Sequence, residues 1–80
     1  MACINPDGTL TEVARRVLTA LDRPLAPEAL AAAAALPVYR IRATLRETGR
    51  AKLVEAVAAG PPELWQVTDL GREALELDAS

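Results

Sequence analysis

Three prolines limit how long any helix in the first half of this chain can be: Pro24, Pro27 and Pro37. A proline inside a helix removes a hydrogen bond and clashes with the preceding turn, whereas a proline in the first turn is tolerated. Pro24 therefore closes one helix and Pro27 opens another. Pro37 ends the second helix, because the residue before a proline avoids helical dihedral angles. We expect short helices that pack against one another.

The first two helices are predicted by their start signals and by their apolar spacing. Thr9 and Glu12 form a T-x-x-E capping box, which is typical of a helix start. Over about residues 10–22, apolar residues then recur at helical spacing: Leu10, Val13, Ala14, Val17, Leu18 and Leu21. Glu28 and the alanines up to Ala35 predict a second helix of about two turns, since alanine has the highest helix propensity.

A third helix is predicted from about Val38 to Thr48, with Gly49 as its stop. The spacing of apolar residues then changes. The β-prone runs 53–57 and 64–67 flank a loop that is rich in glycine and proline. This arrangement is typical of a β-hairpin.

A last short helix is predicted from Asp69 to about Leu77, because Thr68 is a suitable N-cap. The predicted order is therefore helix, helix, helix, hairpin, helix. Eighty residues allow one small domain, so we expect a single domain over 1–80 with its core at about 10–77. The fold class is mainly α with a small β-hairpin (α+β).

Composition excludes several functions. The chain has no histidine and one cysteine, Cys3, so an internal disulfide, a Cys/His zinc site and histidine-based catalysis are ruled out. No nucleophile, phosphate-loop or paired-carboxylate motif is present, and we expect no enzyme activity, no metal site and no cofactor. No run reaches the roughly 18 apolar residues of a membrane span, and the N-terminus lacks a signal-peptide pattern. We therefore expect a soluble, cytoplasmic protein without membrane contact.

A family resemblance is carried by several short motifs in a fixed order: Pro27-Glu28-x-Leu30-Ala31, Leu36-Pro37, Ile41-x-x-x-Leu45-Arg46-Glu47, Leu53-Val54 and Trp65-Gln66-Val67-Thr68-x-x-Gly71-x-x-x-Leu75. This order resembles the winged helix-turn-helix core of MarR-type and related bacterial and archaeal regulators, over about residues 10–77. The resemblance implies a three-helix core, a wing and a short C-terminal helix. It also implies sequence-specific binding of double-stranded DNA by a small transcriptional regulator, commonly as a homodimer.

Three positions depart from the family pattern. Ala35 stands where the turn between the second and third helices usually carries glycine, and Thr48 stands where the third helix usually ends in an apolar residue. The turn before the wing is usually Ala-Gly, and here it is Ala51-Lys52. None of these changes is expected to break the fold, but Thr48 should weaken the core locally.

The third helix concentrates positive charge. The segment 38–52 contains five cations and one carboxylate, a local charge of +4, although the whole chain carries −2. A binding surface is local, so such a patch can still attract a polyanion. Acidic residues outnumber basic ones elsewhere, which makes this segment exceptional within the chain.

Helical geometry predicts which side of the third helix meets the core. At about 100° per residue, Val38, Ile41, Leu45 and Thr48 share one arc of roughly 80°. The opposite arc carries the candidate DNA-binding residues: Tyr39, Arg40, Arg42, Ala43, Arg46 and, if the helix extends that far, Arg50.

The second helix of a helix-turn-helix motif enters the major groove with its outward face. Arginine can pair with guanine edges or with phosphates, so Arg40, Arg42 and Arg46, with Tyr39, are expected in the groove. Arg50 and Lys52, which close the candidate set, are better placed for phosphates. The alternative is that these arginines only solvate an exposed helix face, but such faces usually mix both signs of charge.

A second function remains open. The predicted wing tip is uncharged and flanked by Glu55 and Glu63, and acidic groups beside phosphates lower affinity. The domain could instead be a protein–protein interaction module that places its basic helix on an acidic partner. If the chain is a homodimer, the first helix, the N-terminal segment or the last helix must supply the contact. Trp65 is expected to cover the core rather than to stack on bases, and Cys3 is expected to have no function.

Overall fold

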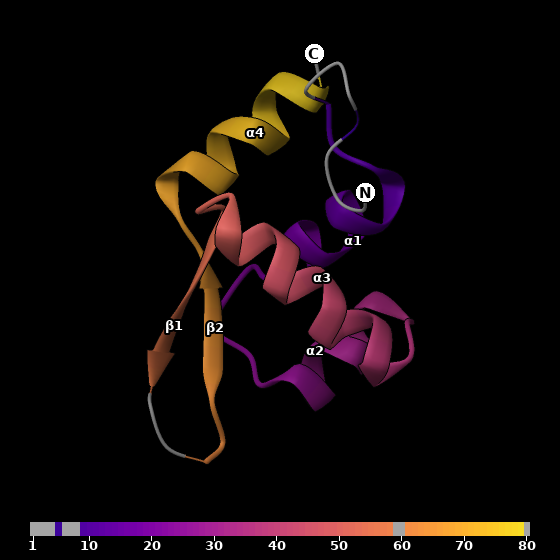
Figure 1. Ribbon diagram of the computed structural model, residues 1–80, viewed down its shortest axis with the longest axis vertical. Coiled ribbons are helices and arrows are strands. Elements are labelled where there is room, and N and C mark those ends of the chain that lie inside the picture. The colour runs from indigo at the N-terminus through magenta and orange to yellow at the C-terminus, as the bar shows by residue number, and fades with distance from the viewer. Residues whose placement is uncertain (1–4, 6–8, 59–60, 80) are drawn as a thin grey trace.

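The computed structural model describes residues 5, 9–58 and 61–79 of the chain. Within them lie four helices and one β-hairpin, in the order α1 (Glu12–Ala20), α2 (Pro27–Ala34), α3 (Val38–Arg50), β1 (Val54–Ala58), β2 (Leu64–Val67) and α4 (Asp69–Ala79) (Figure 1). This is the predicted order, and the architecture is that of a winged helix. Cys3 lies outside the described residues.

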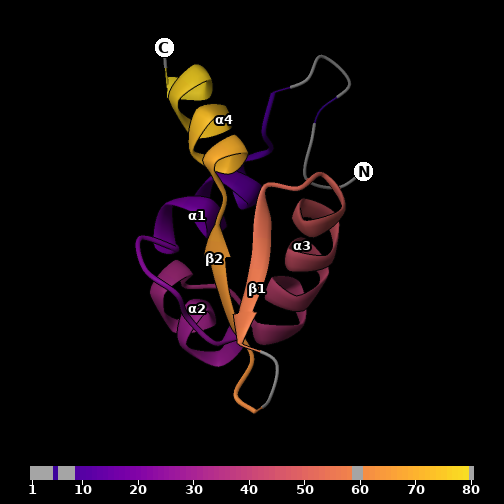
Figure 2. The same ribbon diagram turned by 90° about the vertical axis from the view of Figure 1, so that its left-hand side faces the viewer.

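The three first helices enclose an aliphatic core that the hairpin and α4 complete. Its largest fully buried apolar side chains, Leu18, Leu30 and Ile41, come one each from α1, α2 and α3. The hairpin lies along one side of this bundle (Figure 1), and in the view of Figure 2 α1 and α2 are seen to one side of the strands and α3 to the other. Because each of the three helices contributes to one core, the orientation of α3 is fixed by packing on two neighbours.

The hairpin is antiparallel, with Val54 opposite Val67 and an irregularity in register after Ala56. The segment between α1 and α2 extends it, because Leu25 and Trp65 exchange two backbone hydrogen bonds of 3.0 and 2.9 Å. The sequence did not predict this third pairing. A single bridging residue has no periodicity by which it could be recognised.

The predicted capping box at the start of α1 is wrong. The N-cap is Thr11, whose hydroxyl accepts a hydrogen bond from the amide of Ala14 at 3.2 Å. Thr9 lies before the helix, where its carbonyl accepts a hydrogen bond from the amide of Asn5 at 2.7 Å. Glu12 is the first helical residue, so its carboxylate faces the positive end of the helix dipole without closing a capping box.

The end of α2 is a Schellman motif, in which the chain reverses through one left-handed residue. The amide of Leu36 donates to the carbonyl of Ala31 at 3.0 Å. Ala35, the residue before Leu36, is left-handed, with φ 56°. Ala35, which stands where the family usually has glycine, therefore adopts a left-handed backbone conformation. Alanine here adopts the conformation that glycine adopts with the least steric cost.

The end of α3 repeats this geometry. The amide of Leu53 donates to the carbonyl of Thr48 at 2.8 Å, and Lys52 has φ 67°. The departure from the family pattern at Ala51-Lys52 is therefore also a left-handed residue other than glycine. The prediction that Gly49 ends this helix is wrong. Gly49 lies inside α3, two residues before the C-cap Ala51.

We expect Ala35→Gly to stabilise the protein by about 0.5–1 kcal/mol. A side chain in the left-handed region costs roughly 1–2 kcal/mol, and part of this gain is offset by the greater freedom of glycine in the unfolded chain. Urea unfolding followed by circular dichroism measures the change. Ala33→Gly, two residues earlier within α2, should instead cost about 1 kcal/mol. Equal destabilisation by both substitutions would contradict the assignment of the strain to Ala35.

The N-terminus of α4 is anchored to the end of α3. The Thr68 hydroxyl donates to the Lys52 carbonyl at 2.7 Å and accepts from the amide of Gly71 at 3.1 Å, which confirms Thr68 as the predicted N-cap. At the other end of α4, Asp78 accepts from the Arg15 side chain at 2.6 Å. These contacts fix α4 against α1 and against the α3–β1 turn. None of the helices described here is long and apolar enough to cross a membrane.

Candidate nucleic-acid interface

The buried side of α3 determines which residues it exposes. Ile41, Thr44, Leu45 and Thr48 are buried. Val38, which we had placed in the core arc, is 36% exposed. The buried side of α3 is thus rotated toward Thr44, compared with the side that the spacing of apolar residues predicted. A threonine such as Thr44 can occupy a core position when its hydroxyl forms a hydrogen bond.

Thr48 shows how the core accepts such a residue. Its side chain is fully buried, and its hydroxyl donates to the carbonyl of Thr44 at 2.7 Å. A buried hydroxyl without a partner would cost several kcal/mol in an apolar environment. This bond to the preceding turn makes the polar residue compatible with the core at the position where the family usually has an apolar one.

Every charged candidate residue lies on the exposed surface. Tyr39 is 72% exposed, and Ala43 is half-buried at the edge of the same face. The exposed cations are Arg40, Arg42, Arg46, Arg50 and Lys52. Arg50 is the last residue of α3, and Lys52 follows in the turn before β1. The predicted set therefore lies on the exposed part of α3 and on the turn that follows it, and we call these residues together the α3 face.

Two of these cations are held by carboxylates. Arg42 donates to Glu28 of α2, with 2.9 Å between Nη2 and Oε2. Arg50 lies 3.7 Å from Glu47 on its own helix. Glu47 was the only acid expected on this face, and Glu28 is brought to it by the packing of α2 on α3. Including Glu28 lowers the local charge from +4 to +3.

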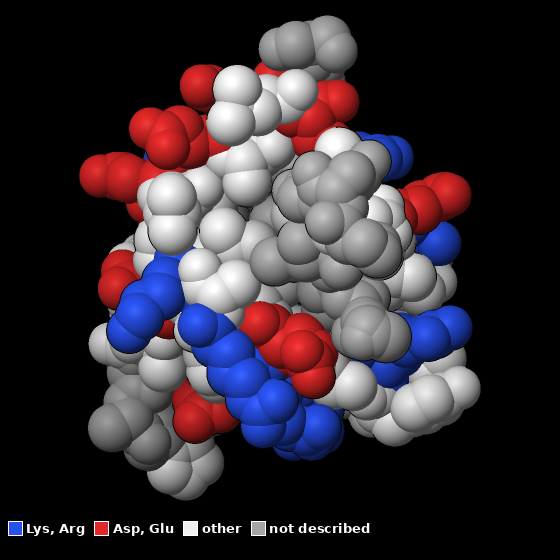
Figure 3. All heavy atoms as spheres, turned by 45° about the horizontal axis from the view of Figure 1, so that its top comes forward, with Lys and Arg blue, Asp and Glu red and all other residues white. Residues whose placement is uncertain are grey.

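The other three cations have no ion pair with any residue in the described part of the chain: Arg40, Arg46 and Lys52. Figure 3 shows the uneven charge of one side of the molecule, with acidic side chains gathered toward α4 and basic ones farther from it. An acidic group also lies among the basic side chains in this view. The free cations are available for an external anion.

A hollow separates α3 from the wing. It measures about 290 Å³ and is lined by Pro27, Arg42, Leu45, Arg46, Glu63 and Trp65. Trp65 is half-buried against the core, as predicted, and its indole nitrogen donates to Glu63 at 3.2 Å. On the same hairpin, Glu55 accepts from the Gln66 amide at 2.7 Å. The two wing carboxylates are thus exposed and bonded within the hairpin, while Pro61 and Pro62 add no charge.

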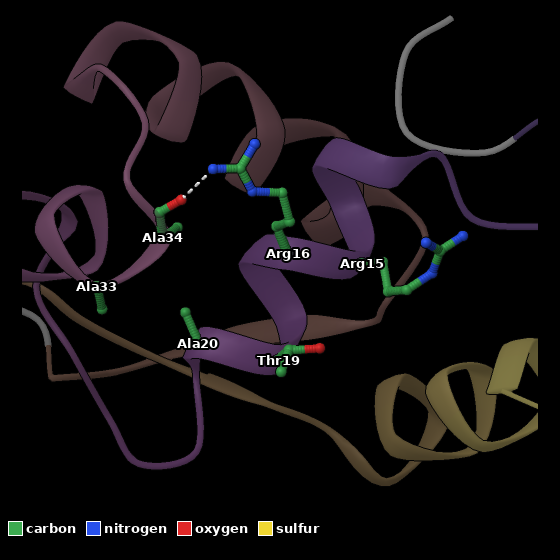
Figure 4. Close-up of a pocket in the computed structure, with 6 residues that line it drawn as sticks. All are labelled: Arg15, Arg16, Thr19, Ala20, Ala33 and Ala34. Atoms are coloured by element: carbon green, nitrogen blue, oxygen red, sulfur yellow. Dashed lines mark hydrogen bonds between the residues drawn. The ribbon is translucent and has the colours of Figure 1, made fainter.

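Two further arginines, Arg15 and Arg16 of α1, were not singled out by sequence. They line a second hollow of about 280 Å³ between α1 and the end of α2 (Figure 4). Arg16 points across it and donates to the carbonyl of Ala34 at 2.8 Å, while Arg15 points toward α4. Arg16 therefore satisfies a terminal carbonyl of α2, where a cation also complements the helix dipole. Both arginines are occupied in holding helices together.

In the described residues, no group of three or more histidine, cysteine, aspartate or glutamate side chains could hold a metal ion.

Comparison of the amino-acid sequence with known proteins gives no match. No protein-family model matches the chain, and no curated protein matches it.

Several solved structures share the fold. BpsR of Bordetella bronchiseptica, whose DNA binding is regulated by 6-hydroxynicotinic acid, aligns with TM-score 0.85 and 24% identity over 92% of this chain. A MarR family transcription regulator aligns with TM-score 0.81 and 21% identity over 88%. AF1382 from Archaeoglobus fulgidus aligns with TM-score 0.66 and 16% identity over 85% of this chain and 81% of its own.

The chain spans only part of the two regulators, 56% of BpsR and 50% of the MarR family protein. The shared part includes nearly all of the structure described above. At these identities the likeness establishes architecture. The chain therefore has the winged helix-turn-helix fold found in MarR-family transcription regulators.

Proposed function

We propose that this domain binds double-stranded DNA with sequence preference and acts as a small cytoplasmic transcriptional regulator, placing α3 in the major groove. The observation that carries the proposal is the set of free cations on the α3 face. In a helix-turn-helix motif, the outward side of the second helix reads base edges. Here that side exposes Arg40 and Arg46, which have no ion pair with the residues that the structure describes, in a chain whose net charge is −2.

Each part of the α3 face has a role in this proposal. Arg40, Arg42 and Arg46 would pair with guanine edges, for which the planar guanidinium is suited. Tyr39, near the start of α3, would contact a phosphate or a thymine methyl group, and Ala43 leaves room for a base between the arginines. Arg50 and Lys52, at the far end, would contact the backbone.

The experiment compares Arg46→Ala with Arg72→Ala. Both variants lose one exposed arginine, but Arg72 lies on α4 and pairs with Asp69. We expect Arg46→Ala to weaken binding to a duplex selected from a random pool by about 1–3 kcal/mol and to relax sequence preference. Arg72→Ala should retain both. Equal effects of the two substitutions on fluorescence-anisotropy titrations would contradict major-groove insertion of α3.

Binding of an acidic protein is the second candidate. It is favoured by the exposed wing carboxylates, Glu55 and Glu63, which would repel a phosphate backbone. In this case the α3 face would contact carboxylates of a partner. Salt dependence does not separate the two functions, since both interfaces are electrostatic, whereas sequence preference among duplexes does.

A homodimer is part of the proposal, because twofold dimers match palindromic sites. Support comes from α4, where Leu70 and Leu77 are 50% and 75% exposed. They lie seven residues apart and so on the same side of the helix. The last helix is therefore the candidate contact between copies, among the three segments considered from the sequence.

A further inference from the structure

Glu28 and Arg42 form the one contact between carboxylate and guanidinium that joins α2 to the α3 face in the described residues. The two side chains are 14 positions apart in the sequence, with 2.9 Å between Oε2 and Nη2. Both are more than half exposed, at 69% and 55%. Such a pair adds little to stability, so its effect on what Arg42 can bind matters more than its effect on folding.

We propose that Glu28 is a positioning residue that directs Arg42 to base edges and prevents it from binding phosphates. This inference rests on the proposed DNA-binding function. In a helix-turn-helix motif the first helix crosses the DNA backbone, and Glu28 is in the first turn of that helix, α2. A phosphate that bound Arg42 would have to displace this carboxylate and would then lie beside it.

A base edge, unlike a phosphate, can bind Arg42 without displacing Glu28. The guanidinium has five N–H donors in a fixed plane, and Glu28 uses the donor at Nη2. The remaining donors can still pair with the O6 and N7 acceptors of guanine. The ion pair is therefore compatible with base reading and opposes phosphate binding.

Arg46 provides an internal comparison. It lines the same hollow as Arg42, one turn farther along α3. In the part of the chain that the structure describes, no carboxylate pairs with it. Glu63, the acid that lines this hollow, accepts from the indole of Trp65. Glu28 thus restrains Arg42 and not Arg46, and this restraint can be removed without altering the neighbouring arginine.

The test uses Glu28→Gln, with Asp22→Asn as the control that removes the same charge outside α3 and α4. Asp22 follows α1 and, like Glu28, is an exposed carboxylate paired with an exposed arginine, Arg23. Both variants, and wild type, are titrated with random-sequence duplex DNA over a range of salt concentrations. We expect Glu28→Gln to bind several-fold more tightly than Asp22→Asn. Its log–log salt slope should steepen by about 0.9, the value for one additional phosphate contact. Its preference for a duplex selected by wild type over random duplex should fall.

Arg42→Ala separates an effect through Arg42 from general repulsion. In that background, Glu28→Gln and Asp22→Asn should bind random duplex equally and with the same slope. The inference is overturned if Glu28→Gln matches Asp22→Asn in the wild-type background, or if the steeper slope persists without Arg42. Wild type that binds no duplex would overturn the proposed function and this inference together, whereas binding without a Glu28 effect would overturn only the inference.

Discussion

Gly71→Ala is expected to destabilise the protein by about 3 kcal/mol or more, at or above the upper end of the usual cost of overpacking. A Cβ at this position would lie 2.2 Å from the carbonyl oxygen of Leu53 and 2.9 Å from Cγ2 of Val67. The first clash is with backbone, which cannot rotate away as a flexible side chain can. Helix α4 would have to move from the α3–β1 turn.

That movement is opposed by hydrogen bonds on both sides of the clash. The carbonyl of Leu53 accepts from the amide of Thr68 at 3.0 Å, and the amide of Leu53 donates to Thr48 at 2.8 Å. The Thr68 hydroxyl is bonded to Lys52 as well. A shift of α4 would therefore break the hydrogen bonds from Thr68 to Lys52 and Leu53, the two residues that follow the C-cap of α3.

Gly49→Ala is the matched control, since it adds the same methyl group to another helical glycine. A Cβ there would lie 4.0 Å from the ring of Trp65, an ordinary contact. Because alanine has a higher helix propensity, the substitution should stabilise by about 0.5–1 kcal/mol. Urea unfolding followed by Trp65 fluorescence and circular dichroism measures both variants. A Gly71→Ala protein as stable as wild type would show that α4 is not packed on the α3–β1 turn.

Leu45→Ala should cost about 2–5 kcal/mol, the range for truncating a buried leucine. Leu45 is 3% exposed and belongs to the core shared by the three first helices. A domain of this length has a total stability of roughly 4–12 kcal/mol. The substitution could therefore unfold much of the protein at physiological temperature.

The adjacent residue is the control for this prediction. Arg46 is exposed, about 100° around α3 from Leu45, so Arg46→Ala should change the unfolding midpoint little while weakening DNA binding. Leu45→Ala should lower the midpoint and reduce DNA binding only in proportion to the unfolded fraction. If the two variants exchanged these effects, the rotation of α3 about its axis would be wrong.

Local signals in the sequence predicted the elements and their order. Pro27 at the start of α2 and Thr68 before α4 act through their own backbone geometry, so a short window of residues contains the information. Errors occurred where two local signals competed. Thr9 and Thr11 are both suitable N-caps, and the helix begins after the second. Glycine is the residue type that commonly ends a helix in a left-handed conformation, but in α3 Gly49 is helical and the left-handed residue after the helix is Lys52.

The candidate site was predicted in part for the same reason. The spacing of Ile41 and Leu45 fixes which side of α3 is buried, and the exposed arginines follow from it. The pairing of Arg42 with Glu28 could not be predicted, because it depends on how α2 packs against α3. Nothing in the residues around Glu28 indicates a partner 14 positions away. The bridge between Leu25 and Trp65 is a long-range contact of the same kind.

The most direct test of DNA binding is a titration of fluorescent random-sequence duplex with wild-type protein at about 50 mM and near-physiological salt, with the mass determined by light scattering. Arg40, Arg46 and Lys52 have no ion pair in the described part of the chain. If all three contact phosphates of a random duplex, they predict a log–log salt slope of about 3 in magnitude, and a dimer that places two such faces on the duplex predicts a steeper one. Absence of binding at the lower salt concentration, where nonspecific contacts are strongest, would contradict the proposal and favour an acidic protein partner.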